Sequence, residues 1–378
     1  MTAPCACFAG VIFAVCFIYL IPVSTTNMGE LLLTIPSSGN SPSFNSLTFS
    51  PNGMMFACTL SRKNRPPVVV VWNMAAVFGG RGGFVREVMR STFTIQTDIE
   101  QGIAFSHDST KIAIAGHDGV HIISLALGED ADGVFTARRS RSDNKDLHFI
   151  ARGVGATMIS MAFGNDGKTF VTAPIRIDGE TYVSEISVMY FINSAVVVMH
   201  SLRGHVREVV AMHFSPSPKN SEFFISCGAD GQARLWNSQT GAGHGLLKSS
   251  GGGGAPGITD VRISPCGRFA ATTNVNNTTT IWSLMNGMDV KTLSGHYDHV
   301  LAVAWSPDGK TLVTGSKDHT LRIWDVASGF CERTIQHHGS WVVAVQWMWR
   351  GHWRNSSVLS ASFDRTVKMY TFDLPSIV

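Results

Sequence analysis

The sequence has few charged residues and only a small excess of positive charge. Of its 378 residues 15% are charged, against about a quarter in an average soluble domain, and the formal net charge is +3. So small an excess gives little attraction to a polyanion, and charge alone therefore does not predict a nucleic-acid-binding protein. The 44% of hydrophobic residues suffice for a large core, and the sparsely charged exterior favours burial in a larger assembly.

The sequence also lacks disulfide, metal-binding and catalytic motifs. Its seven cysteines include no Cys-x-x-Cys pair, so we expect reduced thiols and a cytosolic or nuclear setting for the folded part. There is no HExxH, no GxSxG and no histidine cluster at ligand spacing. Two Gly-Lys-Thr strings, at 167–169 and 309–311, lack the earlier glycine of a phosphate-binding loop. We therefore predict no metal, no cofactor and no enzymatic activity.

No charged side chain occurs before Glu30. Residues 8–23, FAGVIFAVCFIYLIPV, are continuously apolar, which is short for a transmembrane helix, although the uncharged flanks lengthen it. A secretory signal would normally carry Lys or Arg before its apolar run. A membrane anchor, a cleaved signal and a buried N-terminal segment all stay open. We treat residues 1–29 as a hydrophobic segment separate from residues 30–378.

A repeat runs through the chain after residue 29. Its clearest unit, LSGHYDHVLAVAWSPDGKTLVTGSKDHTLRIWDVASG, alternates apolar runs with a Ser-Pro-Asp-Gly turn and a second turn at Asp318, which predicts a three-stranded meander. The following FCERTIQ supplies a fourth strand. Aligning the first turns gives seven units spaced 42 to 58 residues apart, with anchors at Ser50, Ser106, Gly164, Ser215, Ser264, Ser306 and Met348.

These units resemble the WD40 family. The resemblance rests on Gly204-His205 with Trp236-Asn237 and on Gly295-His296 with Trp324-Asp325, and it extends over residues 30–378. It implies an all-β fold, a seven-bladed WD40 β-propeller whose four-stranded sheets surround a central channel.

The two ends of the repeat predict how the ring closes. The last unit stops after its third strand, near Asp373, while Glu30–Ile35 matches the outer-strand segments of other units. Because an open sheet edge invites unwanted pairing, we predict that this N-terminal strand closes the last blade.

The resemblance further implies a buried hydrogen-bond network in each blade, which joins the His of Gly-His, a Ser or Thr, the turn Asp and the Trp. A buried carboxylate needs such partners. A Ser-His-Asp hydrolase is the functional alternative, but the set recurs in three units at the spacing of the fold, which favours a structural role. The expected members are His296, Thr314, Asp318 and Trp324; His205, Ser226, Asp230 and Trp236; and His338, Ser360 and Asp364, with Tyr370 in place of Trp.

WD40 proteins commonly bind partners on the narrower face of the propeller. Alignment with the family places Trp341 and Phe363 there beside Lys317, a composition that is typical of residues that dominate binding energies. Packing of Trp341 against the neighbouring blade is the alternative. The predicted partner-binding residues are Trp341, Phe363, Lys317, His299, Leu301, Val343 and Glu208. The predicted function is a non-catalytic scaffold for protein or peptide partners in a larger complex, with a possible membrane tether at residues 8–23.

A second function involves arginine-rich segments. FGGRGGF resembles one copy of an arginine–glycine RNA-binding box, and ARRSRSDNK adds arginines in a predicted loop. The candidate phosphate contacts are Arg81, Arg138, Arg139 and Arg141. These side chains could contact phosphates of RNA or of a lipid headgroup, whereas two solvated loops are the simpler interpretation.

Overall fold

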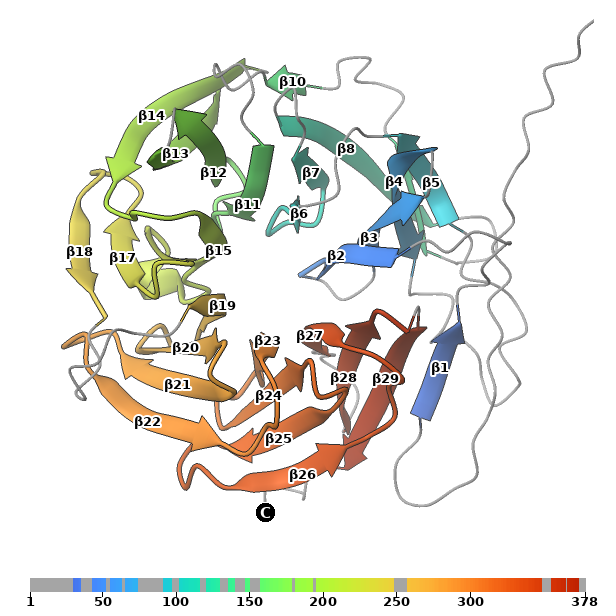
Figure 1. Cartoon of the computed structure of the whole chain (residues 1–378). Coiled ribbons are helices and arrows are strands. Elements are labelled where there is room, and N and C mark those ends of the chain that lie inside the picture. The colour runs from blue at the N-terminus through green and yellow to red at the C-terminus, as the bar shows by residue number, and fades with distance from the viewer. Residues whose placement is uncertain are drawn as a thin grey trace, which may run out of the picture.

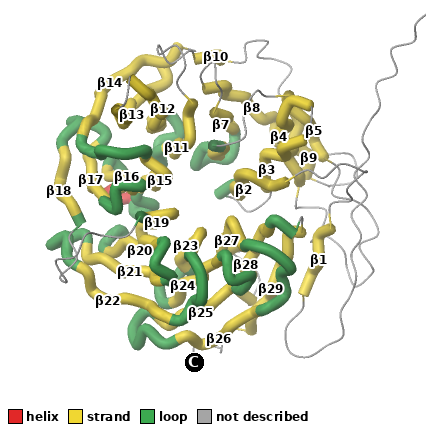
Figure 2. The backbone as a smooth tube through the Cα atoms, in the orientation of Figure 1, coloured by secondary structure: helices red, strands yellow, loops and turns green. Residues whose placement is uncertain are grey.

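The structure, a computed structural model, is built almost entirely of β-strands. It describes residues 30–34, 43–51, 55–62, 65–73, 91–96, 102–115, 120–129, 135–139, 147–149, 157–178, 181–192, 195–247, 257–348, 355–364 and 366–373. Within these ranges the one helical element is η1 (Pro218–Asn220), a 3-10 turn drawn in red in Figure 2. No helix in them is long and apolar enough to cross a membrane. Residues 1–29, predicted as a hydrophobic segment, lie outside the described residues.

The described strands form seven antiparallel sheets around a central opening (Figure 1). Sheet 1 contains β2 (Ser43–Phe49), β3 (Met55–Arg62), β4 (Arg65–Asn73) and β5 (Ser91–Gln96). Sheet 2 contains β6 (Ile103–Phe105), β7 (Lys111–Ala115), β8 (Val120–Glu129), β9 (Phe135–Arg139) and β10 (Leu147–Phe149). Sheet 3 contains β11 (Thr157–Phe163), β12 (Thr169–Asp178), β13 (Thr181–Ile192) and β14 (Ala195–Arg203). Sheet 4 contains β15 (Val209–Phe214), β16 (Phe223–Gly228), β17 (Ala233–Asn237) and β18 (Gly243–Leu246). Sheet 5 contains β19 (Ile258–Ile263), β20 (Phe269–Asn274), β21 (Thr278–Ser283) and β22 (Asp289–Ser294). Sheet 6 contains β23 (Val300–Trp305), β24 (Thr311–Ser316), β25 (Leu321–Asp325) and β26 (Cys331–Ile335). Sheet 7 contains β27 (Val342–Met348), β28 (Asn355–Ser362) and β29 (Thr366–Asp373), together with β1 (Glu30–Thr34).

Sheet 7 joins the two ends of the folded part. The other six sheets use strands that are consecutive in the sequence, whereas β1 pairs antiparallel with β29, from Glu30 opposite Tyr370 to Thr34 opposite Thr366. Figure 1 shows β1 in blue beside β29 in red. The prediction of an all-β propeller is therefore confirmed, and the N-terminal strand occupies the predicted place.

Sheet 2 departs from the predicted four strands. Its outer position is divided, because β10 pairs with the first part of β8 (Val120–Ile122) and β9 pairs with the last part (Leu125–Glu129). The segment that contains Arg138 and Arg139 was predicted to be a loop, and this prediction is wrong for both residues: they end β9. The segment after β8 forms two short strands where the other units have one, so alignment of the units could not reveal the second strand.

The Ser-Pro-Asp-Gly turns fix the register between the first and second strands. The Ser306 hydroxyl accepts a hydrogen bond from the Thr311 amide (2.9 Å) and donates to Asp308 (2.6 Å). Gly309 follows with φ of 71°, a left-handed conformation that favours glycine. In sheet 2 the hydroxyl of Ser106 likewise donates to the Asp108 carboxylate and accepts a hydrogen bond from the Lys111 amide. This turn repeats because one short motif satisfies both ends of the hairpin.

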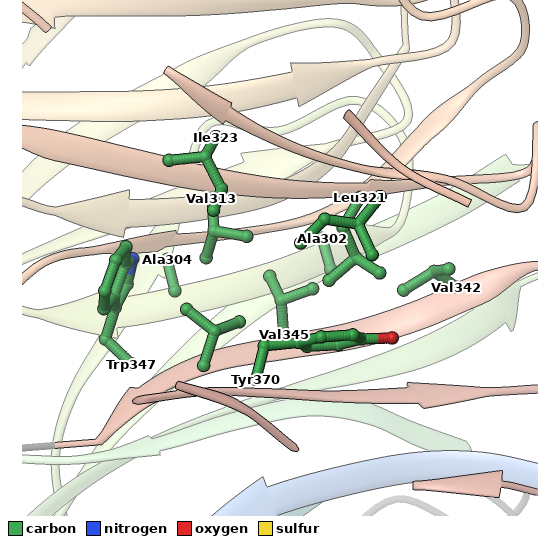
Figure 3. Close-up of a cluster of buried hydrophobic side chains, with 11 residues drawn as sticks. Ala302, Ala304, Val313, Leu321, Ile323, Val342, Val345, Trp347 and Tyr370 are labelled. Carbon is green, nitrogen blue, oxygen red and sulfur yellow. The ribbon is translucent and has the colours of Figure 1, made fainter. Parts of the chain in front are cut away.

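The hydrophobic core lies between neighbouring sheets. Between sheets 6 and 7, Val313 and Ile323 of one sheet face Val345 and Trp347 of the other (Figure 3). All four are buried, which removes their apolar surface from water and holds the two sheets together. The sheets therefore position the residues at their ends rigidly.

Candidate functional site

The network of sheet 6 connects four side chains, which come from a loop, two strands and a turn. His296 Nδ1 lies 2.8 Å from Asp318 Oδ2, and His296 Nε2 lies 2.7 Å from Thr314 Oγ1. Trp324 Nε1 donates to the same Thr314 hydroxyl at 2.9 Å. When Nδ1 donates to the carboxylate, the neutral ring accepts the threonine proton at Nε2, so each polar group is satisfied. The network ties the loop before β23 to the turn after β24.

Sheet 4 carries the same arrangement, and sheet 7 carries its histidine half, with Tyr370 in the place of tryptophan. In sheet 4, His205 contacts Asp230 (3.0 Å) and Ser226 (2.8 Å), and Trp236 donates to Ser226 (2.8 Å). In sheet 7 the corresponding distances are 2.8 Å for His338 to Asp364 and 2.7 Å for His338 to Ser360.

The position of the hydroxyls decides against a nucleophile. Ser226, Thr314 and Ser360 are each 0% exposed, and the first two already accept a hydrogen bond from tryptophan. A catalytic serine must be reached by its substrate, which these side chains are not placed to meet. The geometry therefore supports a structural role for the network.

The turn aspartates are stabilised as carboxylates. Burial alone would raise the pKa of Asp318, but hydrogen bonds from His296, Thr320 and the Tyr297 amide outweigh burial and hold that pKa well below its ordinary value. The pKa of Asp364 is lowered in the same way by His338, Thr366 and the Gly339 amide. Both carboxylates therefore stay charged at neutral pH.

Trp341, Phe363 and Lys317 form one surface cluster, which we call the aromatic patch. The ring centroids of Trp341 and Phe363 are 5.5 Å apart at 33°, and Lys317 Nζ lies 4.3 Å from the Trp341 ring centroid. Trp341 is 39% exposed. Its backbone carbonyl accepts a hydrogen bond from the Phe363 amide (3.0 Å), which holds the two residues side by side. Lys317 comes from sheet 6, so the patch spans two neighbouring sheets.

The remaining predicted partner-binding residues lie in three different places. The His299 carbonyl accepts from the Lys317 amide (2.9 Å), which holds His299 beside the patch. Leu301 and Val343 line a central cavity of about 560 Å³. Glu208 belongs to sheet 4, where its carbonyl accepts from the Ala229 amide (3.0 Å), so sheet 5 separates it from the patch.

The same cavity holds a charged cluster that sequence reasoning missed. Asp260 is buried and lies 3.2 Å from Arg262 Nη1, and it accepts from the Val303 amide of sheet 6 (3.2 Å). Burial raises the pKa of Asp260, although Arg262 opposes this. On sheet 4, His213 Nδ1 accepts from the Ile263 amide (3.2 Å). Burial, assisted by Arg262, lowers the pKa of His213 to about 3, so the ring is neutral.

A signal for this cluster was present in the sequence. Asp260 and Arg262 stand four and two residues before the anchor Ser264, where the neighbouring unit has Ala302 and Ala304 before Ser306. Side chains two positions apart in a strand share a face, so both were candidates for the channel wall. The Asp260 carboxylate links sheet 5 to sheet 6 through the Val303 amide, and the neighbouring Ile263 amide links sheet 5 to sheet 4 through His213.

Of the four predicted phosphate contacts, two lie among the described residues. Arg81 and Arg141 lie outside the described residues, and Arg138 and Arg139 are placed in β9. In the part of the chain that the structure describes, no three His, Cys, Asp or Glu side chains gather as a metal site. Cys227, Cys266 and Cys331 are free thiols there.

The ring of antiparallel sheets and the His–Ser/Thr–Asp–Trp network are typical of a β-propeller of the WD-repeat class. A family model described as the WD domain, G-beta repeat, matches residues 197–237, 287–325 and 329–371. The search of curated proteins found no match to the chain. The three matched repeats and the propeller arrangement of the sheets support a WD40-repeat family. Propellers of this family are generally non-catalytic scaffolds for protein interaction.

Proposed function

We propose that this protein is a non-catalytic scaffold that binds a protein or peptide partner through the aromatic patch, as a subunit of a larger complex. The observation that carries the proposal is an exposed tryptophan held between Phe363 and Lys317. Large aromatic side chains such as tryptophan dominate the energy of protein interfaces, because they bury a large area with few rotatable bonds.

The surroundings of the patch support a peptide rather than a small molecule. The patch is formed by residues at the ends of two sheets, and Leu301 and Val343 on the adjoining first strands continue into the cavity wall. A partner that rests on Trp341 could therefore extend one apolar side chain past these two residues. His299 adds a polar group at the edge of the patch.

The test is affinity purification of the full chain and its variants, with quantitative mass spectrometry of what each retains. Trp341→Ala and Phe363→Ala together should reduce recovery of a defined set of partners by at least tenfold. The matched control is Tyr297→Ala, because Tyr297 is an aromatic residue of sheet 6 that is 82% exposed and outside the patch. Equal recovery with the double variant and with the control would contradict the proposed site.

The membrane tether is a separate part of the proposal. It rests on the uncharged run at residues 8–23, which is long enough with its flanks to enter a bilayer. Deletion of residues 1–29 should move the chain from the carbonate-resistant membrane fraction to the supernatant. A full chain that is recovered only in the supernatant would remove this part and leave the scaffold function standing.

A further inference from the structure

The outer strand of sheet 3 exposes an unusual run of apolar side chains. β14 is the last strand in the order β11-β12-β13-β14 and therefore lies at the sheet edge (Figure 1). Val197, Val198 and Met199 are 42%, 46% and 52% exposed. An edge strand presents its backbone N–H and C=O groups outward, and an apolar edge strand is a template for pairing with another strand.

The other outer strands are protected by charged or polar residues. β22 carries Asp289 and Lys291, β26 carries Glu332 and Arg333, and β1 starts with Glu30. Of the remaining ones, β9 ends in two arginines, β10 and β18 are only three and four residues long, and β5 has hydroxyl or amide side chains at four of its six positions. Such features discourage edge-to-edge pairing.

β14 lacks this protection over most of its length. From Ala195 to Leu202 it contains no Asp, Glu, Lys or Arg, and its first charge, Arg203, lies 3.6 Å from Glu185 of β13. At nine residues it is also longer than the other described outer strands, which have six at most.

The exposed run is held in place rather than loosely attached. β14 pairs with β13 from Ala195 opposite Ile192 to Arg203 opposite Glu185. Phe191 of β13 stacks on Phe170 at 4.9 Å, which fixes the strand pair on the core. The apolar side chains are therefore presented at the surface by a rigid strand.

A β-bulge explains why consecutive residues are exposed. The register shifts between Val188 and Met189, which makes Met199 the extra residue of β14. The same shift occurs in sheet 5, where the extra residue is Val290 between Asp289 and Lys291, and Val290 is 54% exposed. The bulge therefore belongs to the repeat, and the absence of flanking charges distinguishes β14.

We propose that β14 is a dimerisation edge, which pairs antiparallel with β14 of a second copy about a two-fold axis at Val198. This register places Val197 opposite Met199 of the second copy and Val198 opposite itself. The two Arg203 residues then lie ten positions apart, roughly 33 Å, so like charges do not meet. A second copy fits because the uncharged strand is complementary to itself, and an isologous contact of this kind closes as a dimer.

Sedimentation velocity on the purified full chain tests the proposal. The wild-type chain should form a concentration-dependent dimer in the micromolar range, and Val198→Lys should weaken the association at least tenfold. The control Val290→Lys changes an equally exposed valine on a charged edge and should sediment as the wild type does. Circular dichroism and thermal unfolding would show that both variants fold.

Cross-linking supplies a second readout. Val198→Cys should give covalent chain dimers with a short bismaleimide, whereas Val290→Cys should give only the background from the native thiols. A wild-type chain that stays monomeric, a Val198→Lys variant that still dimerises, or a Val290→Lys variant that also loses the dimer would each overturn the proposal. Because none of these substitutions touches the aromatic patch, these results stand apart from those on partner binding.

Discussion

Sheets 5 and 6 are neighbours, yet the hydrogen-bond networks around their buried tryptophans differ. In both, the indole N–H donates to a threonine of the second strand: Trp282 to Thr272 at 2.8 Å and Trp324 to Thr314 at 2.9 Å. Only in sheet 6 does the described network continue through a histidine to a carboxylate. The tryptophan–threonine bond thus suffices to join the two strands, and the His–Asp half adds a link between loop and turn.

Sheet 5 uses uncharged bonds in the corresponding turn. Asn274 Nδ2 donates to Thr278 (3.1 Å) and Thr280 (3.2 Å), and Thr278 donates to Asn276 (2.7 Å), which stands in the place of the turn aspartate. Two of its charged residues, Asp260 and Arg262, line the channel instead. The carboxylates of the two sheets are therefore in opposite environments. Hydrogen-bond donors stabilise the charged form of Asp318 in sheet 6, whereas burial disfavours the charged form of Asp260 in sheet 5.

Removal of the turn carboxylate should have the largest effect. Asp318→Ala deprives His296 and the amides of Tyr297 and Thr320 of their acceptor, so we expect a loss of about 3 kcal/mol in the free energy of unfolding. Asn276→Ala, at an exposed turn, should cost less than about 1 kcal/mol. Urea denaturation measures both, and equal losses would show that the two turns are energetically equivalent.

The threonine substitutions compare the shared half of the network. Thr314→Val removes a partner of both Trp324 and His296, so we expect a loss of about 2 kcal/mol. Thr272→Val removes only the partner of Trp282, so we expect about 1 kcal/mol. The shape of the side chain is nearly kept in each, and a loss in sheet 5 as large as that in sheet 6 would contradict the comparison.

The network of sheet 6 was accessible from sequence because its members recur at fixed distances from a recognisable turn. His296, Thr314, Asp318 and Trp324 each occupy a place set by the repeat, and the structure brings them within hydrogen-bond distance. The pairing of β1 with β29 followed from an incomplete last unit.

Other features depend on contacts between sheets, which a repeat pattern does not specify. The bond from the Val303 amide to Asp260 joins residues 43 positions apart, and the bond from Ile263 to His213 joins residues 50 apart. The exposure of Val198 is likewise a property of the assembled edge, since an apolar run in sequence reads as a buried strand. The divided outer strand of sheet 2 has no counterpart in the other units to align it with.

Acidification should affect the two carboxylates with opposite sign. Because the folded-state pKa of Asp318 lies below its ordinary value of 3.8, its stabilising contribution is present above that value and is lost as the pH falls through the folded pKa. Asp260 has a raised pKa, so its charged form destabilises the fold as the pH rises above 3.8. The urea midpoint between pH 3 and 8 should therefore vary less below pH 4 in Asp318→Asn, and less above pH 4 in Asp260→Asn. Identical profiles would show that neither carboxylate controls the pH dependence.

The smallest expected effect concerns Lys317 and the aromatic patch. In sheet 5 the equivalent residue is Val275, whose amide donates to the Gly257 carbonyl (3.0 Å) as the Lys317 amide donates to His299. The backbone is therefore equivalent, and the difference is the ammonium group 4.3 Å from the Trp341 ring centroid. A double-mutant cycle of Lys317→Ala and Trp341→Ala, measured as free energies of unfolding in urea, should give a coupling energy of about 0.5 to 1 kcal/mol, as expected of a partly exposed cation–π pair. Val275→Ala should change stability by less than about 0.5 kcal/mol. A coupling energy of zero would show that the Lys317 ammonium group interacts with solvent and not with the Trp341 ring. The patch would then bind its partner through the two aromatic rings alone.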